Sequence, residues 1–334
     1  MRMTQTRRRF LTTLSLAGAA GLVRAPQLVA AEGALETTTV RIAKFPGICL
    51  APQFIAEDFL RAEGFTDIRY VDPSQLGTVF AVASGQVDID SNTPWVLIRA
   101  IDARESITAL AGVMVGCYEL FANEGIHGIA DLKGRSVGVQ AAGPTRMGFP
   151  FLLAAHIGLD PDKDIRWVTD PDAKPLELLV QGKIDAFLAF PPEPQESRAR
   201  RVGRVIFSTA ADLPWSQYFC CSLIGNRDFV RTNPVATKRV IRAILKAADL
   251  CAAEPARAAR QLTDVGLVSR YDYALQTISE LPYDKWREYD PEDTIRLYAL
   301  RLHEAGMIKS SPQKIIADGT DWRFLNELKR ELKA

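Results

Sequence analysis

Residue patterns of the common catalytic sites are missing from this sequence of 334 residues. It holds three histidines, His127, His156 and His303, and because their spacing does not suit metal binding we expect them to be structural. No nucleophile elbow, zinc-protease helix, phosphate-binding loop or dinucleotide fingerprint is present. These absences point away from an enzyme, and they predict neither a cofactor nor a metal site.

Cysteine is also scarce, and its five residues show no CxxC spacing: Cys49, Cys117, Cys220, Cys221 and Cys251. Cys220 and Cys221 are neighbours in a predicted strand, so their side chains should point to opposite faces and should not form a disulfide with each other. We expect the cysteines to be small buried residues. Export to an oxidising compartment leaves some other pairing open.

Long apolar runs are absent, and the one near the N-terminus is too short to span a bilayer. Residues 11–23 are uncharged and follow Arg7, Arg8 and Arg9, which is typical of a secretory signal. The paired arginines before Phe10 and Leu11 resemble the twin-arginine consensus, which implies export of a folded protein. We expect cleavage near Ala31 and residues 1–31 as the signal; the alternative is a disordered basic tail.

An excess of basic residues is missing as well. Residues 1–31 carry five basic and no acidic residues, which leaves 36 of the 41 basic residues against all 40 acidic ones. A weakly acidic surface gives no support for nucleic-acid binding, so nucleic acid is not an expected partner. About 300 residues after the signal are enough for two lobes, since a single core stops growing near that size.

Strands and helices alternate through the first two thirds of the chain. Strand patterns cover residues 39–43, 67–71, 87–90 and 106–115, with helical patterns between them. A second set of strands and helices begins near Ile129. There, Pro150 predicts that a helix starts near Gly148. Such alternation predicts an α/β fold with parallel βαβ units, and the chain becomes mainly helical after Asn233.

Two short segments repeat the same pattern in the two sets. Residues 84–89 and 181–186 each end a helix at a glycine and then enter a strand through an aliphatic residue and an aspartate, Asp88 or Asp185. An aspartate there is commonly a local hydrogen-bond partner. The pair resembles the type II periplasmic solute-binding proteins of ABC importers, in the nitrate/sulfonate/taurine and thiamine-precursor group. Residues 131–139 are similar to the start of that family's second lobe. Residues 226–229, 234–249 and 321–325 resemble its return to the first lobe.

The resemblance runs from about Thr39 to the C-terminus and implies a periplasmic binding protein-like II fold, with two α/β lobes joined by a two-strand hinge. Lobe I would hold residues 37–121 and 224–334, and lobe II residues 122–223. Residues 119–122 and 219–223 would form the hinge, and the lobes would close over a solute.

Ligands of open α/β sheets bind beyond the carboxyl ends of the strands, and five segments of the sequence fall there. With two aromatic residues that come just before the second hinge strand, they give these candidate ligand-binding residues: Phe45, Pro46, Gly47, Thr93, Trp95, Cys117, Tyr118, Gly143, Thr145, Arg146, Phe190, Glu193, Trp215 and Tyr218.

The polar candidates favour an anion. Helix N-termini expose N–H groups and partial positive charge, Thr93 and Thr145 add hydroxyl donors, and Arg146 adds a bidentate charged donor for a carboxylate or sulfonate. Thr93 could instead cap its helix, and Arg146 could lie on a solvated face.

The aromatic candidates favour an organic solute over a bare inorganic ion, because small-molecule pockets are mostly apolar. Each aromatic residue could instead belong to the core. Glu193 could receive an amino group or a ring nitrogen of the solute, or pair across the lobes.

The resemblance implies an extracytoplasmic binding protein, monomeric and periplasmic, that delivers a small organic anion to an ABC permease and its ATPase. Two alternatives stay open. One is a pyrimidine-precursor synthase of thiamine synthesis on the same fold, whose cysteine-rich stretch residues 219–222 partly echo. The other is a sensory binding protein.

Overall fold

The computed structural model describes residues 32–45, 47–73, 77–139, 144–170 and 174–332, with only the backbone for residues 144–147. The chain divides into a unit of residues 1–34 and a unit of residues 35–334. Residues 32–34 of the first unit form no helix or strand. The predicted signal, residues 1–31, lies outside the described residues.

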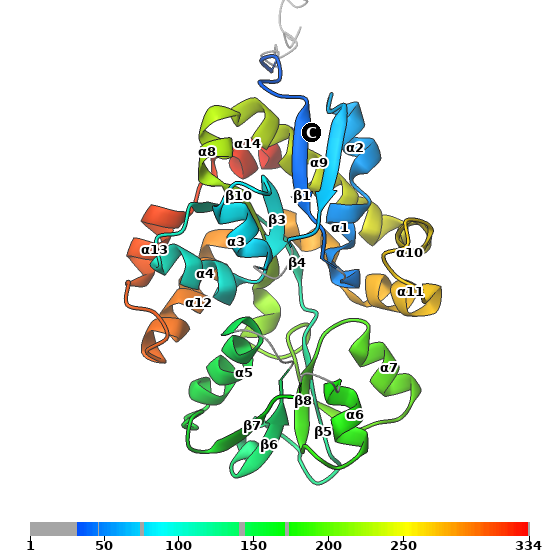
Figure 1. Ribbon diagram of the computed structural model, residues 1–334, viewed down its shortest axis with the longest axis vertical. Coiled ribbons are helices and arrows are strands. Elements are labelled where there is room, and N and C mark those ends of the chain that lie inside the picture. Colours follow the sequence, from blue (N-terminus) through cyan, green and yellow to red (C-terminus); the bar gives the residue numbers. More distant parts are fainter. Residues whose placement is uncertain (1–31, 46, 74–76, 140–143, 171–173, 333–334) are drawn as a thin grey trace, which may run out of the picture. The chain divides into compact units, whose positions relative to one another are not determined.

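Two five-stranded sheets form the framework of the second unit (Figure 1). The first has the order β2-β1-β3-β10-β4: β1 (Thr39–Ala43), β2 (Asp67–Val71), β3 (Ile89–Asn92), β4 (Ile107–Val115) and β10 (Phe219–Asn226). The second has the order β7-β6-β8-β5-β9: β5 (Glu119–Ala122), β6 (Arg135–Gly138), β7 (Ile165–Val168), β8 (Ala186–Ala189) and β9 (Arg204–Ser208).

Four strands of each sheet run in the same direction. The fifth strand lies between two of them and runs in the opposite direction. In the first sheet β10 runs antiparallel to β3 and β4, and in the second sheet β5 runs antiparallel to β8 and β9. The chain enters the second sheet after β4 and returns after β9. This confirms the predicted fold class, with two α/β bodies. The expected hinge strands do not join the bodies, however, because residues 119–122 belong to the second sheet and residues 219–223 to the first.

Helices cover both faces of the first sheet. On one face lie α1 (Ala51–Phe54), α2 (Glu57–Ala62), α9 (Pro234–Ala253), α10 (Pro255–Asp264), α11 (Tyr271–Glu280) and α14 (Arg323–Glu331). On the other lie α3 (Thr78–Ala83), α4 (Pro94–Asp102), α12 (Pro291–Glu304) and α13 (Pro312–Gly319). α8 (Arg227–Thr232) follows β10. The second sheet carries α5 (Pro144–His156), α6 (Pro175–Val180) and α7 (Glu193–Ala199).

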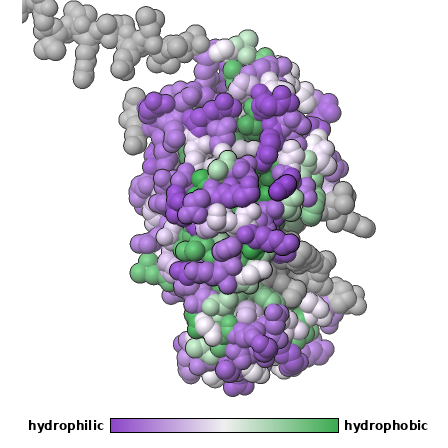
Figure 2. Space-filling view, turned by 90° about the vertical axis from the view of Figure 1, so that its left-hand side faces the viewer, coloured by the Kyte–Doolittle hydropathy of each residue, from purple (hydrophilic) through white to green (hydrophobic). Residues whose placement is uncertain are grey.

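The short 3-10 helices complete the chain, and they are η1 (Ile48–Leu50), η3 (Ile129–Leu132), η4 (Trp215–Gln217) and η5 (Tyr283–Arg287). No helix among the described residues combines the length and the apolar character that crossing a membrane requires. Hydrophilic side chains cover most of the face seen in Figure 2, and the hydrophobic areas on it are small.

The repeated glycine–aspartate pattern occupies equivalent places in the two sheets. The carboxylate of Asp88 accepts a hydrogen bond from the backbone N–H of Arg41 in β1, at 2.7 Å. The carboxylate of Asp185 accepts one from the backbone N–H of Ser136 in β6, at 2.8 Å. In both pairs the aspartate N–H donates back to the carbonyl of the same residue. The local hydrogen-bonding role expected for these aspartates is therefore confirmed.

Two local predictions are wrong. Helix α5 begins at Pro144 rather than near Gly148, and it contains Pro150. Pro150 cannot donate a helical hydrogen bond, but the helix continues because Phe149, Leu152 and Leu153 are buried in the core that it shares with α4 and α12. The second concerns the adjacent cysteines. A register shift in β10 leaves Cys220 without a partner opposite it, because Phe219 pairs with Val115 and Cys221 with Met114.

Such a β-bulge breaks the alternation of side chains along a strand. Cys220 and Cys221 therefore do not face opposite sides of the sheet, and their sulfur atoms interact. The expectation that the cysteines are buried is confirmed, and all five are free thiols.

Candidate functional site

Two short segments connect the sheets, and Thr209 ties them together. The backbone N–H groups of Cys117 and Tyr118, on the outgoing segment, both donate to the hydroxyl oxygen of Thr209 on the returning segment, at 3.1 and 2.9 Å. The N–H of Thr209 donates to the carbonyl of Tyr118 at 2.9 Å. Gly116, at φ +73°, allows this close approach, since a Cβ there would lie 2.6 Å from the side chain of Ala210.

Six aromatic side chains meet at this junction, and they come from both sheets. Trp95 of α4 stacks on Phe149 of α5 with ring centroids 4.7 Å apart. Tyr118 contacts Trp95 at 5.2 Å and Phe190 at 5.6 Å. Trp215 contacts Phe149 at 5.3 Å and Tyr298 of α12 at 5.3 Å. Together these residues form a continuous aromatic network between the sheets.

The network includes four of the aromatic residues expected at the site, namely Trp95, Tyr118, Phe190 and Trp215. Tyr118 and Phe190 are half-buried, whereas Trp95 and Trp215 are buried. Gly47 lies next to Phe190, because a Cβ at Gly47 would lie 3.0 Å from its ring.

The other two predicted aromatic residues take no part in these ring contacts. Phe45 and Tyr218 are half-buried and pack against different core clusters.

The sequence did not indicate Phe149 and Tyr298. Phe149 follows Arg146 by one helical turn, a spacing that would have placed both on one face of a helix. A helix that starts near Gly148 excludes Arg146, so the predicted start hid this relationship between Arg146 and Phe149. Tyr298 lies far along the chain in α12, and no local pattern marks it.

Four polar atoms lie buried without hydrogen-bond partners among the described residues near the ends of β1 and β3: Gln53 Oε1, Asp90 Oδ1, Thr93 Oγ1 and Ser222 Oγ. Thr93 precedes α4, but its side chain makes no capping hydrogen bond, so the alternative role suggested by its position is wrong. Buried polar atoms without partners are uncommon and call for an explanation.

Asp90 is the most perturbed carboxyl group of this region. Burial raises the pKa of Asp90 to about 6, against the effect of a hydrogen bond from the amide of Asn92. Gln53 fixes its own amide by donating to the carbonyl of Ala43 at 2.7 Å. Asp90 and Gln53 were not predicted, because a buried polar residue in a strand or helix has no distinctive sequence signal.

Glu193 has a local role in the structure. Its carboxylate accepts a hydrogen bond from the backbone N–H of Phe190 at 3.0 Å, at the beginning of α7. Arg198 of α7 makes an ion pair between the bodies, because it contacts Glu280 of α11 at 2.8 Å and also pairs with Glu119 of β5.

Four of the predicted residues are described only in part or not at all. Pro46 and Gly143 lie outside the described residues, and Thr145 and Arg146 lie in the first turn of α5, where only the backbone is described. Their roles stay predictions.

Cys117 joins a group of buried thiols beside the network. Its sulfur lies 2.8 Å from that of Cys220, and the sulfurs of Cys49, Cys117 and Cys221 all lie within 4.8 Å of one another. Hydrogen bonds from the thiols of Cys117, Cys220 and Cys49 lower the pKa of Cys221. Burial raises the pKa of each of the other three. Cys251 is also buried but does not belong to this group.

Cys117 also lines a small pocket on the side of the connection toward α7 and α11, with a volume of about 40 Å³. Glu119, Glu280 and Gln195 lie around it. The volume suits a few water molecules or an ion, whereas sites for organic ligands usually measure roughly 300 Å³ or more.

Comparison with known protein families assigns the chain. A family model described as NMT1/THI5 like matches residues 51–258, which is more than half of the chain. The chain belongs to this family. The resemblance seen in the sequence is thereby confirmed, and the matched range includes α4, α5, both connecting segments and three of the four grouped cysteines, Cys117, Cys220 and Cys221. A comparison with the curated proteins finds no match.

Solved structures of periplasmic binding proteins share the fold. The nitrate-binding protein NrtA from Synechocystis PCC 6803 is 16% identical, with 90% of each chain covered and a TM-score of 0.72. The aliphatic sulphonate binding protein SsuA from Escherichia coli is 19% identical, with 84% of this chain and 92% of that chain covered and a TM-score of 0.67.

The alkanesulfonate-binding protein SsuA from Xanthomonas axonopodis pv. citri, bound to MOPS, is 15% identical, with 86% of this chain and 100% of that chain covered and a TM-score of 0.67. At these identities the comparison establishes the fold.

Proposed function

We propose that the protein is the extracytoplasmic solute-binding subunit of an ABC importer. It captures a small organic anion between its two lobes and delivers the anion to a membrane permease. The observation that carries this proposal is the aromatic network, in which Trp95 of one body meets Phe149 of the other at the connection. Aromatic walls with few polar groups are typical of small-molecule sites.

Several observations support a negatively charged solute. The fold relatives are described as binding nitrate, aliphatic sulphonate and alkanesulfonate. Thr93 supplies a buried hydroxyl that has no partner among the described residues, at the N-terminus of a nine-residue helix. Helix N-termini favour anions. We assign Arg146, in the first turn of α5, the role of charged clamp for the carboxylate or sulfonate group.

We further propose that the body around the first sheet, which includes β10, moves as lobe I, and that the body around the second sheet, which includes β5, moves as lobe II. The lobe boundaries then lie within a few residues of the expected 37–121 with 224–334 and 122–223. The connecting segments at 116–118 and 209–218, which lie next to the expected hinge strands, allow this motion. The protein acts in the periplasm as a monomer after export of residues 1–31 by the twin-arginine route, and it needs no catalytic group.

A thermal-shift screen of the purified protein with alkanesulfonates, taurine, nitrate, pyrimidine precursors and aromatic acids tests the proposal. A bound solute raises the melting temperature in proportion to ln(1 + [L]/Kd). We expect at least one organic anion to raise it, and the rise to shrink strongly in Arg146→Ala. The pyrimidine-precursor synthases that the chain also resembles use a lysine-bound pyridoxal phosphate. If no solute shifts the midpoint and pyridoxal phosphate instead gives a lysine aldimine spectrum, the enzyme alternative replaces this proposal.

A further inference from the structure

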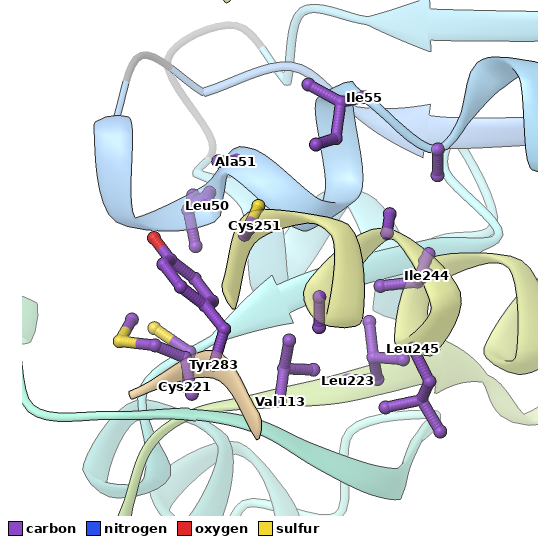
Figure 3. Close-up of a cluster of buried hydrophobic side chains, with 14 of the residues drawn as sticks. Leu50, Ala51, Ile55, Val113, Cys221, Leu223, Ile244, Leu245, Cys251 and Tyr283 are labelled. Atoms are coloured by element: carbon purple, nitrogen blue, oxygen red, sulfur yellow. The ribbon is translucent and has the colours of Figure 1, made fainter. Parts of the chain in front are cut away.

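The thiol group described above joins three segments that are distant in the sequence. Cys49 lies in η1 after β1, Cys117 lies in the outgoing connection, and Cys220 and Cys221 lie in β10. All four are at most 5% exposed. Figure 3 shows Cys221 beside Tyr283, whose hydroxyl donates to the carbonyl of Cys49 at 3.1 Å. The fold therefore gathers four reduced sulfurs in one buried place.

Two local distortions place these sulfurs together. The β-bulge at Cys220 turns both cysteines of β10 toward the group, and bulges commonly redirect side chains beside functional sites. Cys117 has φ 144°, which is unusual for a residue with a side chain and typically costs about 1–3 kcal/mol. Its backbone is held there by the hydrogen bond to Thr209. Strain of this kind persists where the surrounding structure enforces it.

We propose that Cys49, Cys117 and Cys221 form a binding site for one soft, thiolate-preferring metal ion, and that Cu(I) is the ion the site fits best. Three sulfur ligands at about 2.3 Å from a central ion lie roughly 4 Å apart, which agrees with a group whose sulfurs all lie within 4.8 Å. Thiolates select soft ions such as Cu(I) and zinc, and structural zinc almost always takes four ligands. Cys220 lies 2.8 Å from Cys117 but is not one of the three sulfurs that all lie within 4.8 Å of one another, so it is not counted as a ligand.

An access path and a proton balance complete the site. Cys117 lines the small pocket beside Glu119 and Glu280, so this opening is the nearest route to the sulfurs; both carboxylates pair with Arg198 and add no net attraction for a cation. Each thiol that binds the ion releases its proton to solvent, and no electron is transferred. Metal sites are recognised in a sequence by ligands that are close together along the chain. Cys49, Cys117 and Cys221 are far apart in the sequence and meet only in the folded protein, so the sequence predicted no site.

The test is titration of the reduced full chain with Cu(I), delivered without oxygen from a competing chelator. We expect one ion per chain and an X-ray absorption spectrum with sulfur neighbours only. Cys117→Ser should weaken binding by at least about 100-fold, since loss of a group that only orients a ligand already costs about 10- to 100-fold. Cys251→Ser, a buried cysteine outside the group, is the matched control and should bind as the wild type does.

Several results would overturn this site. These are no Cu(I) binding by the reduced wild type, nitrogen or oxygen neighbours in its spectrum, or equal losses in the Cys117 and Cys251 variants. The spectrum of the wild type decides the matter even if Cys117→Ser fails to fold. A protein that forms a Cys117–Cys220 disulfide and binds no Cu(I) after reduction would equally exclude the site. Solute binding plays no part in these readouts, so they are independent of the importer proposal.

Discussion

The indole of Trp95 stacks on the phenyl ring of Phe149 with an interplanar angle of 20°. Trp95 belongs to α4, which packs on the first sheet, and Phe149 belongs to α5 of the second. Stacked aromatic pairs add about 0.5–1.5 kcal/mol beyond the burial of their area. This pair is a direct contact between the two bodies, and we propose that it couples their position to a solute bound beside it.

Trp95→Ala tests that coupling. Removal of a buried indole typically lowers the free energy of unfolding by about 3–5 kcal/mol. We expect a loss in that range, measured by urea unfolding, and at least a tenfold weaker solute affinity at a temperature where the variant is folded. Trp95→Phe keeps a ring for Phe149 and should lose less of both. Unchanged solute affinity in Trp95→Ala would remove the aromatic network from the site.

Thr93→Val separates binding from stability. The hydroxyl of Thr93 is buried without a partner among the described residues, so its removal should leave the unfolding free energy unchanged or raise it by about 1 kcal/mol. Solute affinity should fall about tenfold if the hydroxyl donates to the anion. Thr93→Ser retains the hydroxyl and serves as the control for calorimetric titration. A valine variant that binds as tightly as the serine variant would show that the hydroxyl does not contact the solute.

Asp90→Asn tests whether burial of the Asp90 carboxylate lowers the free energy of unfolding. Burial raises the pKa of Asp90 to about 6, whereas an unfolded aspartate has a pKa of about 4. Between these values the folded state binds more protons than the unfolded state, so this group lowers stability as pH rises from about 4 to about 6. Above about pH 6 Asp90 is ionised in both states, and its destabilising effect no longer changes with pH.

We therefore expect Asp90→Asn to be more stable than the wild type by about 1–3 kcal/mol at pH 8 and nearly equal to it at pH 4. Urea unfolding at pH 4, 6 and 8 measures the difference. A difference that does not change with pH would contradict the assignment of this group.

Asp185→Ala tests the second sheet. Burial opposes ionisation of Asp185, but hydrogen bonds from Ser136 outweigh it and lower its pKa. The alanine variant leaves the buried N–H of Ser136 without its acceptor and should lose about 1–3 kcal/mol at pH 7. Because the pKa is lowered in the folded state, this contribution is present above about pH 4 and is lost as pH falls further.

The exposed Asp162 in the same body provides the control, since Asp162→Ala should change stability by less than about 0.5 kcal/mol. Equal effects of the two substitutions would show that the tie between β6 and the segment before β8 does not stabilise the sheet.

Much of the fold could be predicted because its signals are local. A glycine that ends a helix, followed by an aliphatic residue and an aspartate, marks Asp88 and Asp185 in the sequence. Their carboxylates accept backbone hydrogen bonds from β1 and β6, which occupy equivalent places in the two sheets. Strand periodicity located the strands to within a few residues. The two α/β bodies agree with the fold of the family that the same patterns resemble.

The site could be predicted only in part, because it depends on distant contacts. Position at a strand end was enough to select Trp95, Tyr118 and Phe190. It could not select Tyr298, which reaches the network from α12. Nor could it show that Glu193 accepts the N–H of Phe190. The bulge at Cys220 has no sequence signature, since it arises from the pairing of β10 with β4.

Isothermal titration of the purified protein with the organic anions that raise its melting temperature tests the central claim most directly. We predict that at least one sulfonate or carboxylate binds with a stoichiometry of one per chain, a negative heat capacity change from burial of apolar surface, and greatly reduced affinity in Trp95→Ala. Absence of binding by every anion, or tight binding that Trp95→Ala leaves unchanged, would contradict a solute site between the lobes.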